Sequence, residues 1–245
     1  MKAEVKKEQS VNLKTEVNEL SNHLLASLAR ALSLAEEPGA SAWLSARPVQ
    51  EHGFSLHKTA FRDAVALRYG GEPDNLPSHC VWGKLFDVTP ALSCAKGGFV
   101  IVRHNEIRDL TASLLEEVCH DVETEPGIQP LSGEQFSSQS TTRDNAARLN
   151  VKASGFFWGG RFECTFFDVR IFNPHVRSNQ SITKSMTLVY LRHEMAKRRM
   201  YNQSVRDVEM ASFTPLVFST SGGWGPAATV AMKRVAALLH SQRES

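Results

Sequence analysis

The chain has 245 residues, and 28 Lys and Arg side chains against 26 Asp and Glu give it a formal charge of only +2. A composition of 42% hydrophobic and 22% charged residues can bury a core, which excludes low-complexity chains and disulfide scaffolds. No apolar run approaches the roughly 18 to 20 residues of a membrane span, and the first residues alternate charges where a signal peptide would be apolar. We expect an intracellular, soluble protein that makes no membrane contact.

The first 77 residues have a helical pattern. Apolar residues recur at intervals of three and four from Asn12 to Glu37, which predicts an amphipathic helix. Its apolar stripe is most simply a packing surface, and a contact with a partner protein is the alternative. A second helix is expected from Lys58 to Leu67. The stretch that follows, to Gly98, has no regular pattern.

Beyond Gly98 the chain alternates between helical and strand patterns. We expect a helix from Asn105 to Val122, and a polar loop that runs to about Ala146. The later elements expected are strands at Arg148–Phe156 and Phe162–Phe172, a helix at Met186–Met210, a buried strand at Phe213–Ser219 and a helix at Ala227–His240. This order predicts an α/β fold in residues 99–245.

Two of these strands are predicted to form a hairpin. If Trp158-Gly159-Gly160 is a three-residue loop, the numbers of paired residues sum to 318, and Asn150 lies opposite Asp168. One face of the hairpin is then apolar, with Leu149, Val151, Ala153, Phe167, Val169 and Ile171. The other face carries Asn150, Lys152, Asp168 and Arg170. A half-solvated sheet would produce the same alternation.

Basic residues are concentrated in one segment. From Arg170 to Arg206 there are eight Lys and Arg but a single acid, Glu194. Such a segment favours a nucleic-acid backbone as partner, and Arg170, Arg198 and Arg199 are candidate contacts; a solvated helix face is the alternative. Within the expected helix Tyr190, Glu194, Lys197 and Tyr201 share one face. An Asp on a strand beside cationic side chains suits metal-assisted phosphodiester hydrolysis.

Mg²⁺ usually takes more than one acidic ligand. Glu106, near the start of the Asn105–Val122 helix, is the second ligand that we add to Asp168.

Four short motifs then resemble, in order and spacing, the restriction-like endonuclease of site-specific non-LTR retrotransposons. They are Arg103-His104-Asn105, Arg148-Leu149-Asn150, Phe167-Asp168-Val169-Arg170-Ile171, and Lys197 with Tyr201. The resemblance covers residues 78 to 220 and implies the PD-(D/E)XK nuclease fold, a mixed sheet flanked by helices, here with a helical N-terminal extension. Residues Trp43 to Arg68 look like the connecting region of retroelement reading frames.

The resemblance assigns roles residue by residue. Asp168 corresponds to the metal-binding acid, and Asn150 stands where the family has the Asp of its "PD" element. Lys197 and Tyr201 become helix-borne active-site groups, and Arg103-His104-Asn105 lies near the nucleic acid or the metal. Asn150 lacks the charge that holds a divalent cation. Arg170 replaces the usual Lys or small residue, and its guanidinium cannot serve as a base.

The family also carries a zinc knuckle before its Arg-His-Asn motif. The segment from His79 to Cys94 resembles that knuckle, with Trp82 in place of its second Cys and Pro90 in place of its His. Only Cys80 and Cys94 remain as vestigial zinc ligands, whereas a structural zinc site needs four. We therefore expect a loop without zinc at 78–98, with Trp82 packed against the body.

The sequence thus predicts a retroelement-derived domain that binds DNA or an RNA/DNA hybrid, in the nucleus if expressed in a eukaryote. It would descend from a Mg²⁺-dependent endonuclease whose cleavage is weakened or lost. One alternative is a non-catalytic module that binds nucleic acid or protein. The other is an enzyme that binds a nucleotide at the Gly222–Gly225 loop, which lies between a strand and a helix.

Overall fold

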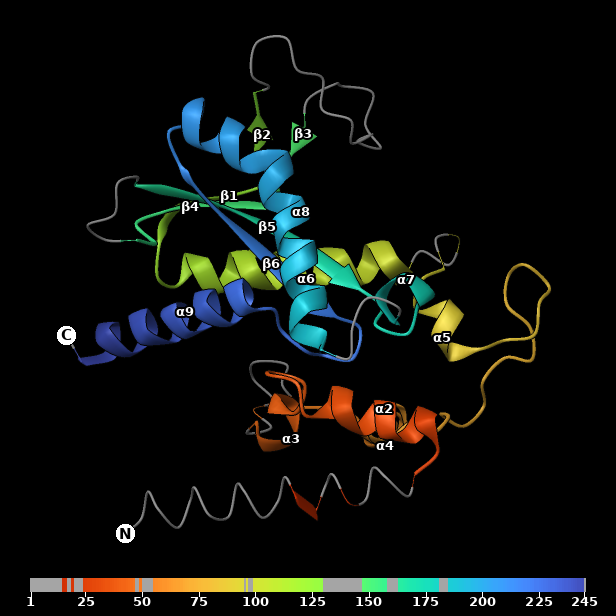
Figure 1. Ribbon diagram of the computed structural model, residues 1–245. Helices are drawn as coiled ribbons and strands as arrows, with labels where there is room; N and C mark the ends of the chain where they lie inside the picture. The colour runs from red at the N-terminus through yellow and green to blue at the C-terminus, as the bar shows by residue number, and fades with distance from the viewer. Residues whose placement is uncertain are drawn as a thin grey trace. The chain divides into compact units, whose positions relative to one another are not determined.

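A computed structural model describes residues 15–16, 19, 24–46, 49, 55–94, 96, 99–129, 147–157, 163–180 and 185–244 (Figure 1). The chain divides into two compact units. One comprises Met1–Ser78 with Ser221–Gly223, and the other comprises His79–Thr220 with Trp224–Ser245. Among the described residues, none of the helices combines the length and the hydropathy that a membrane span requires.

The first unit is helical where it is described. Its helices are α2 (Ala26–Ala35), α3 (Ala42–Ser45) and α4 (Lys58–Arg68). The guanidinium of Arg68 donates to the carbonyl oxygens of Ala35 at 2.8 Å and Ala40 at 2.9 Å, which ties the end of α4 to the end of α2. The helix expected at Lys58–Leu67 is confirmed. Of the helix expected at Asn12–Glu37, α2 confirms the part from Ala26 to Ala35, but Leu24 and Leu25 are not helical, so the helix is not continuous; residues 12–14, 17–18 and 20–23 lie outside the described residues.

The second unit holds the sheet. Its helices are α5 (Val88–Ala91), α6 (Phe99–Glu116), α7 (Arg177–Gln180), α8 (Met186–Asp207) and α9 (Pro226–Glu244). Its strands are β1 (His120–Thr124), β2 (Gly127–Ile128), β3 (Ala147–Arg148), β4 (Val151–Ser154), β5 (Cys164–Phe172) and β6 (Ser212–Ser219).

Strands β1, β4, β5 and β6 form one mixed sheet in the order β1-β4-β5-β6. Strand β4 runs antiparallel to β1 and β5, and β6 is parallel to β5 because α8 crosses between them. Strands β2 and β3 pair separately. The predicted mixed sheet flanked by helices is confirmed.

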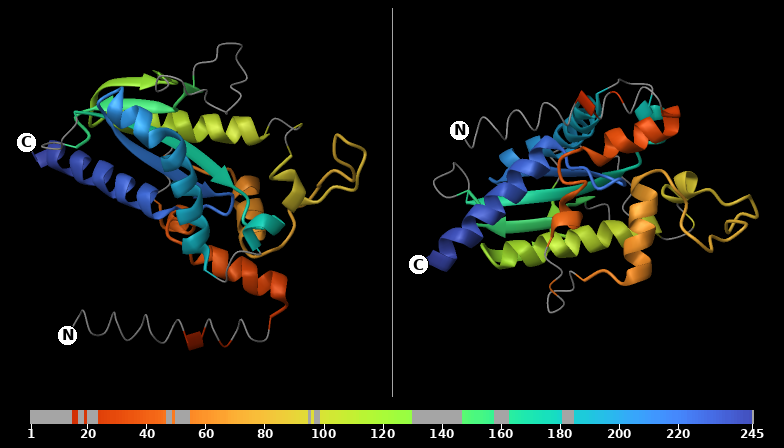
Figure 2. Two further views of the ribbon diagram at one scale, coloured as in Figure 1. Left: turned by 45° about the horizontal axis from the view of Figure 1, so that its top comes forward. Right: turned by 90° about the horizontal axis from the view of Figure 1, so that it is seen from below.

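Helices cover both faces of this sheet (Figures 1 and 2). Helices α6 and α9 pack on one face, in a core whose largest members include Leu115, Phe156, Phe167 and Leu216. Helix α8 packs on the other face, where the buried apolar residues are Ile128, Leu149, Phe166, Phe172, Val189, Tyr190, Tyr201, Val205, Ala211, Phe213 and Val217. Strand β5 is therefore buried on both sides.

The hairpin register is as predicted, but its faces are not. Val151 pairs with Phe167 and Ala153 with Thr165, so paired numbers sum to 318. Leu149, however, packs on the α8 side with Phe166, opposite to the side predicted for it. The chain bends at Asn150, where β4 begins, and this bend changes the side to which Leu149 points. The face predicted to be polar is a second buried layer.

Strand β1 replaces the end of a predicted helix. Helix α6 runs from Phe99 to Glu116, and His120–Thr124 forms an edge strand. Val122 is its single half-buried residue, and Asp121 takes a left-handed backbone with φ of 49°. An edge strand that is charged and exposed carries almost no apolar alternation. The pattern that extended the helix to Val122 was therefore wrong.

Candidate functional site

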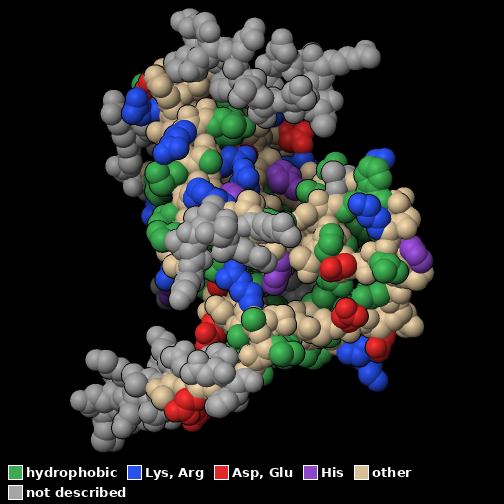
Figure 3. Space-filling view, turned by 45° about the vertical axis from the view of Figure 1, so that its right-hand side comes forward, with side chains coloured by type: hydrophobic (Ala, Val, Ile, Leu, Met, Phe, Trp, Pro, Cys, Tyr) green, Lys and Arg blue, Asp and Glu red, His purple; other side chains and the backbone are tan. Residues whose placement is uncertain are grey.

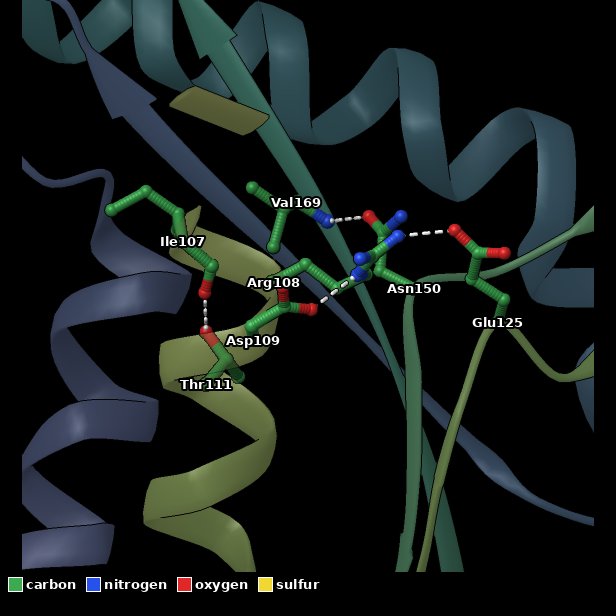
Figure 4. Close-up of polar contacts among 7 residues, drawn as sticks. All are labelled: Ile107, Arg108, Asp109, Thr111, Glu125, Asn150 and Val169. Carbon is green, nitrogen blue, oxygen red and sulfur yellow. Dashed lines mark hydrogen bonds and ion pairs between the residues drawn. The ribbon is translucent and has the colours of Figure 1, made fainter. Parts of the chain in front are cut away.

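Strands β4 and β5 part at Asn150. The backbone N–H of Asn150 donates to the carbonyl oxygen of Phe167 at 3.2 Å, and its side-chain Oδ1 accepts from the N–H of Val169 at 2.6 Å (Figure 4). The next residue toward the N-terminus, Leu149, already bonds the carbonyl of Pro126 instead. The Asn150 side chain thus continues the β4–β5 ladder for one step after the main chain has turned away.

Asp168 lies between the two β5 residues that Asn150 bonds. Its side chain faces α8 and the residue is only 4% exposed. The ammonium Nζ of Lys197, on α8, lies 2.6 Å from Asp168 Oδ2. Burial raises the pKa of the Asp168 carboxyl, although the nearby charges of Lys197, His104 and Arg170 oppose that rise. The structure thus brings Asp168, Asn150 and Lys197 together.

The shared face of α8 is confirmed. Tyr190, Glu194 and Tyr201 are buried against the sheet, and Lys197 lies among them with 17% of its side chain exposed. The Tyr201 ring packs against Phe213, and its centroid lies 5.4 Å from the Lys197 ammonium. Tyr201 therefore packs between the sheet residue Phe213 and the lysine of its own helix.

Glu194 has a different role from its neighbours on this face. Its Oε1 accepts a hydrogen bond from the backbone N–H of Ala227 at 2.9 Å, in the first turn of α9. Burial raises the pKa of the Glu194 carboxyl, and the Ala227 bond acts in the opposite direction.

Of the Arg103-His104-Asn105 motif, His104 reaches the site. Its Nε2 donates to the carbonyl oxygen of Val169 at 3.3 Å, because a carbonyl can only accept. Arg103 instead donates to the carbonyl of Leu92 at 3.0 Å, and burial lowers its pKa. Asn105 is half-buried on the same helix. Only His104 of the three has a described contact with β5.

Glu106 does not join the site. It is exposed, and on a helix of 3.6 residues per turn it points away from the face of α6 that carries His104, Thr111 and Leu115. The packing of Ala112 and Leu115 against the sheet decides which face of α6 is buried, and the sequence did not reveal it. The pairing of Glu106 with Asp168 is therefore corrected.

The groups around Asp168 do not suit Mg²⁺ as they stand. One carboxylate is present, and it is already paired with an ammonium, while the amide oxygen of Asn150 is engaged by Val169. Among the described residues no three His, Cys, Asp or Glu side chains gather in a way that could hold a metal. Mg²⁺ normally binds through one or two carboxylates with several waters, which this ion pair does not offer.

The predicted basic contacts are exposed. Arg170 lies on the α8 side of β5, and Arg198 and Arg199 lie on α8 itself. Arg198 also donates to the carbonyl of Phe213 at 3.4 Å. Lys, Arg and His side chains occur close together in the upper left and centre of the face seen in Figure 3.

The knuckle-like segment forms a small turn. Residues His79 and Leu85 form a β-bridge, and Cys80 and Cys94 are half-buried cysteines that are not joined in a disulfide. Trp82 is 57% exposed, so the expectation that it packs against the body is wrong. The ammonium of Lys96 lies 3.6 Å from its ring centroid, and this contact replaces the expected packing.

Sequence reasoning missed two features near the site. His193 is buried one turn before Lys197, and only its spacing from Lys197 could have indicated it. Arg108, on α6, forms ion pairs with Asp109 and with Glu125 (Figure 4). The N–H of Glu125 donates to the carbonyl oxygen of Asn150 at 2.9 Å, so this ion pair braces the bend at Asn150.

A scan against protein-family models finds no match to the chain, and a search of curated proteins finds no similar sequence.

Proposed function

We propose that the chain is a retroelement-derived DNA-binding domain related to PD-(D/E)XK endonucleases, with cleavage weakened or lost. The observation that carries the proposal is the buried Asp168 carboxylate on β5, 2.6 Å from the helix-borne Lys197 ammonium and flanked by the two hydrogen bonds that Asn150 makes to the backbone of β5. Those three residues are the ones to which the resemblance assigns an active site.

The order of elements supports the same proposal. Helix α6, the strands β1, β4 and β5, the crossover helix α8 and the strand β6 follow one another along the chain. This is the order of helix, strands, crossover helix and strand that the resemblance implies. Asn150 and Asp168 sit together where β4 and β5 diverge, below the crossover helix α8 that carries Lys197.

Loss of cleavage follows from the charge at residue 150. An Asp there would accept the Val169 N–H with one carboxylate oxygen and present the other to a cation. Asn150 presents an amide nitrogen instead, which donates hydrogen bonds and cannot bind a metal. Lys197 then neutralises Asp168, and we expect the native chain to bind DNA without cutting it.

The Asn150→Asp variant tests the site. We expect nicking of supercoiled plasmid in Mn²⁺ or Mg²⁺ to rise at least tenfold above the level of the native chain, because the second carboxylate restores a cation ligand. The Asn150→Asp, Asp168→Asn double variant is the matched control and should show none of that gain. Equal nicking by the native chain and by the single variant would refute the assignment of this site.

DNA binding is tested on the exposed arginines of α8. Replacing both Arg198 and Arg199 by Gln should weaken binding to a short duplex and reduce the slope of log K against log salt by about 1 to 2, because each phosphate contact releases counterions. Lys58→Gln with Lys233→Gln removes the same charge from exposed positions on α4 and α9. An arginine variant with the affinity of this control would rule out α8 as the DNA contact.

The structure gives no support to a nucleotide site at Gly222–Gly225. The backbone N–H of Ala227, in the first turn of α9, already donates to buried Glu194. A carboxylate at this position competes with any phosphate for the same end of the helix.

A further inference from the structure

His193 carries a buried nitrogen to which none of the described residues forms a hydrogen bond. The residue is 7% exposed, and its ring lies 4.5 Å from the ring of Phe172 at an interplanar angle of 32°. That stacking fixes the plane of the imidazole. Its Nε2 has no hydrogen-bond partner among the described residues. An unsatisfied buried polar atom costs about 1 to 3 kcal/mol, so such atoms are uncommon unless something outside the chain bonds them.

Two arginines lie close enough to His193 to act on its charge. Together with burial, Arg170 and Arg192 lower the pKa of the imidazole to about 4, so the ring is neutral at pH 7. Arg192 is already committed, because it donates to Asn179 Oδ1 at 2.5 Å and to the carbonyl of Ser178 at 3.2 Å. Arg170 is exposed and has no hydrogen bond or ion pair with any described residue.

The two groups adjoin the Asp168 site on the same layer. Arg170 follows Asp168 by two residues on β5, so both side chains point toward α8. His193 precedes Lys197 by four residues on α8, so both point toward β5. Asp168 is neutralised by Lys197, and Glu194 is bonded to Ala227, so neither carboxylate is available to pair with Arg170.

We propose that Arg170 and His193 form a binding site for one phosphate group of the DNA backbone, next to the position that Asp168 and Lys197 occupy. The inference rests on the proposed function in one respect, namely that the phosphate group belongs to DNA. The guanidinium supplies charge and two parallel N–H donors, and the imidazole donates one hydrogen from the otherwise unbonded nitrogen. A phosphate oxygen satisfies both groups at once.

Inorganic phosphate tests the site without DNA. In the full ¹⁵N-labelled chain we expect a saturable chemical-shift change at the ring nitrogens of His193 in NMR spectra. We also expect the pKa of the imidazole to rise by about one unit, which means that phosphate binds about tenfold more tightly to the protonated ring. Chloride at the same ionic strength should produce neither effect. No response of His193 to phosphate would overturn the proposed site, whether or not the chain binds DNA.

A short DNA duplex tests the source of the phosphate. His193→Phe keeps the stacking on Phe172, and we expect it to weaken binding about five- to tenfold with an unchanged salt slope, because a neutral donor releases no counterion. Arg170→Gln should weaken binding and also lower the slope by about 1. His240→Phe, at an exposed position of α9, is the matched control and should bind like the native chain.

The outcomes separate the two proposals. If phosphate binds at His193 but no variant changes DNA affinity, the site takes a free phosphate group and the DNA assignment is refuted. If the native chain does not bind DNA at all, the proposed function fails while the phosphate result still decides the site.

Discussion

The two faces of β5 are both buried but differ in kind. Toward α6 and α9 the strand presents Phe167, Val169 and Ile171 to an apolar core. Toward α8 it presents Phe166, Asp168, Arg170 and Phe172, opposite Lys197 and His193. One strand thus supports a packing core on one side and a layer of ionisable groups on the other.

The difference indicates what each side is for. Burial of apolar surface stabilises a fold by about 25 cal/mol per Å² and requires only that the side chains pack well together. Buried ions lose hydration, which their mutual attraction only partly offsets, so an ion pair such as Asp168–Lys197 is a poor way to gain stability. The α8 layer retains such groups at a cost, which is expected of a site rather than of a core.

The largest effect should come from breaking the ion pair. Lys197→Met leaves Asp168 buried without a counter-charge, and we expect the free energy of unfolding at pH 7 to fall by about 3 to 5 kcal/mol. Urea denaturation measures this. Without the lysine the pKa of Asp168 rises further, so the deficit should shrink as the pH falls and Asp168 takes up a proton.

The matched double variant sharpens the comparison. Asp168→Asn with Lys197→Met removes both charges, and most of the lost stability should return. A double variant as unstable as Lys197→Met alone would mean that Lys197 contributes by packing. The α8 side would then resemble the apolar side of β5.

The second prediction concerns Gly225. A Cβ atom at this position would lie 2.7 Å from Glu194 Oε1 and 3.2 Å from the carbonyl oxygen of Val217. Gly225→Ala must displace the carboxylate from Ala227, and we expect a loss of about 2 to 3 kcal/mol. Gly127→Ala is the control, because no atom lies within 4 Å of its added Cβ.

A double-mutant cycle checks the cause. In the Glu194→Ala background the added methyl group meets no carboxylate, so Gly225→Ala should cost less there than in the native chain. Equal costs in both backgrounds would place the strain at Val217 instead.

The parts of this fold that could be predicted are those in which the sequence repeats a pattern. The hairpin register agrees with the loop length assumed for Trp158-Gly159-Gly160, although that loop itself lies outside the described residues, and the inward face of α8 followed from the spacing of Tyr190, Glu194, Lys197 and Tyr201. Strand β1 did not follow, because a charged edge strand has no apolar alternation. The side of Leu149 did not follow either, since the bend at Asn150 depends on tertiary bonds to Val169 and Glu125.

The candidate site was predictable in the same limited sense. Asp168 and Asn150 were placed opposite each other by register, and Lys197 by helical spacing, and these relations are local. Glu106 was assigned to the wrong side because packing, not spacing, decides which face of α6 is buried. The one signal for His193 was its four-residue spacing from Lys197, which does not suffice because a polar residue at an inward helical position looks like a solvated one until its neighbours are known.

The pH dependence of stability tests His193, the buried imidazole on α8. Unfolded His has a pKa near 6.5, whereas that of folded His193 is about 4, so below pH 6.5 only the unfolded chain takes up this proton. Stability should fall as the pH drops from 6.5 toward 4. We expect His193 to account for about 1 to 2 kcal/mol, allowing for solvent screening. Denaturation of the native chain and of His193→Phe at pH 7 and pH 5 should show a smaller fall for the variant; equal falls would contradict this.

The smallest effect should come from replacing Lys152. This variant tests whether the charge of a side chain or its burial lowers the stability on the α8 side of the sheet. Lys152 stands opposite Glu123 in the β1–β4 ladder, with Nζ 3.7 Å from the carboxylate, and the two side chains are 34% and 56% exposed. Solvent screens such a pair, so Lys152→Gln should change the free energy of unfolding by no more than about 0.5 kcal/mol. Lys197→Met removes the cation on α8 that pairs with Asp168 on β5. Urea denaturation of the two variants compares their losses of stability directly. A loss at Lys152 as large as that at Lys197 would mean that charge itself stabilises this side of the sheet. A near-neutral Lys152 beside a costly Lys197 instead locates the cost in the desolvation of Asp168.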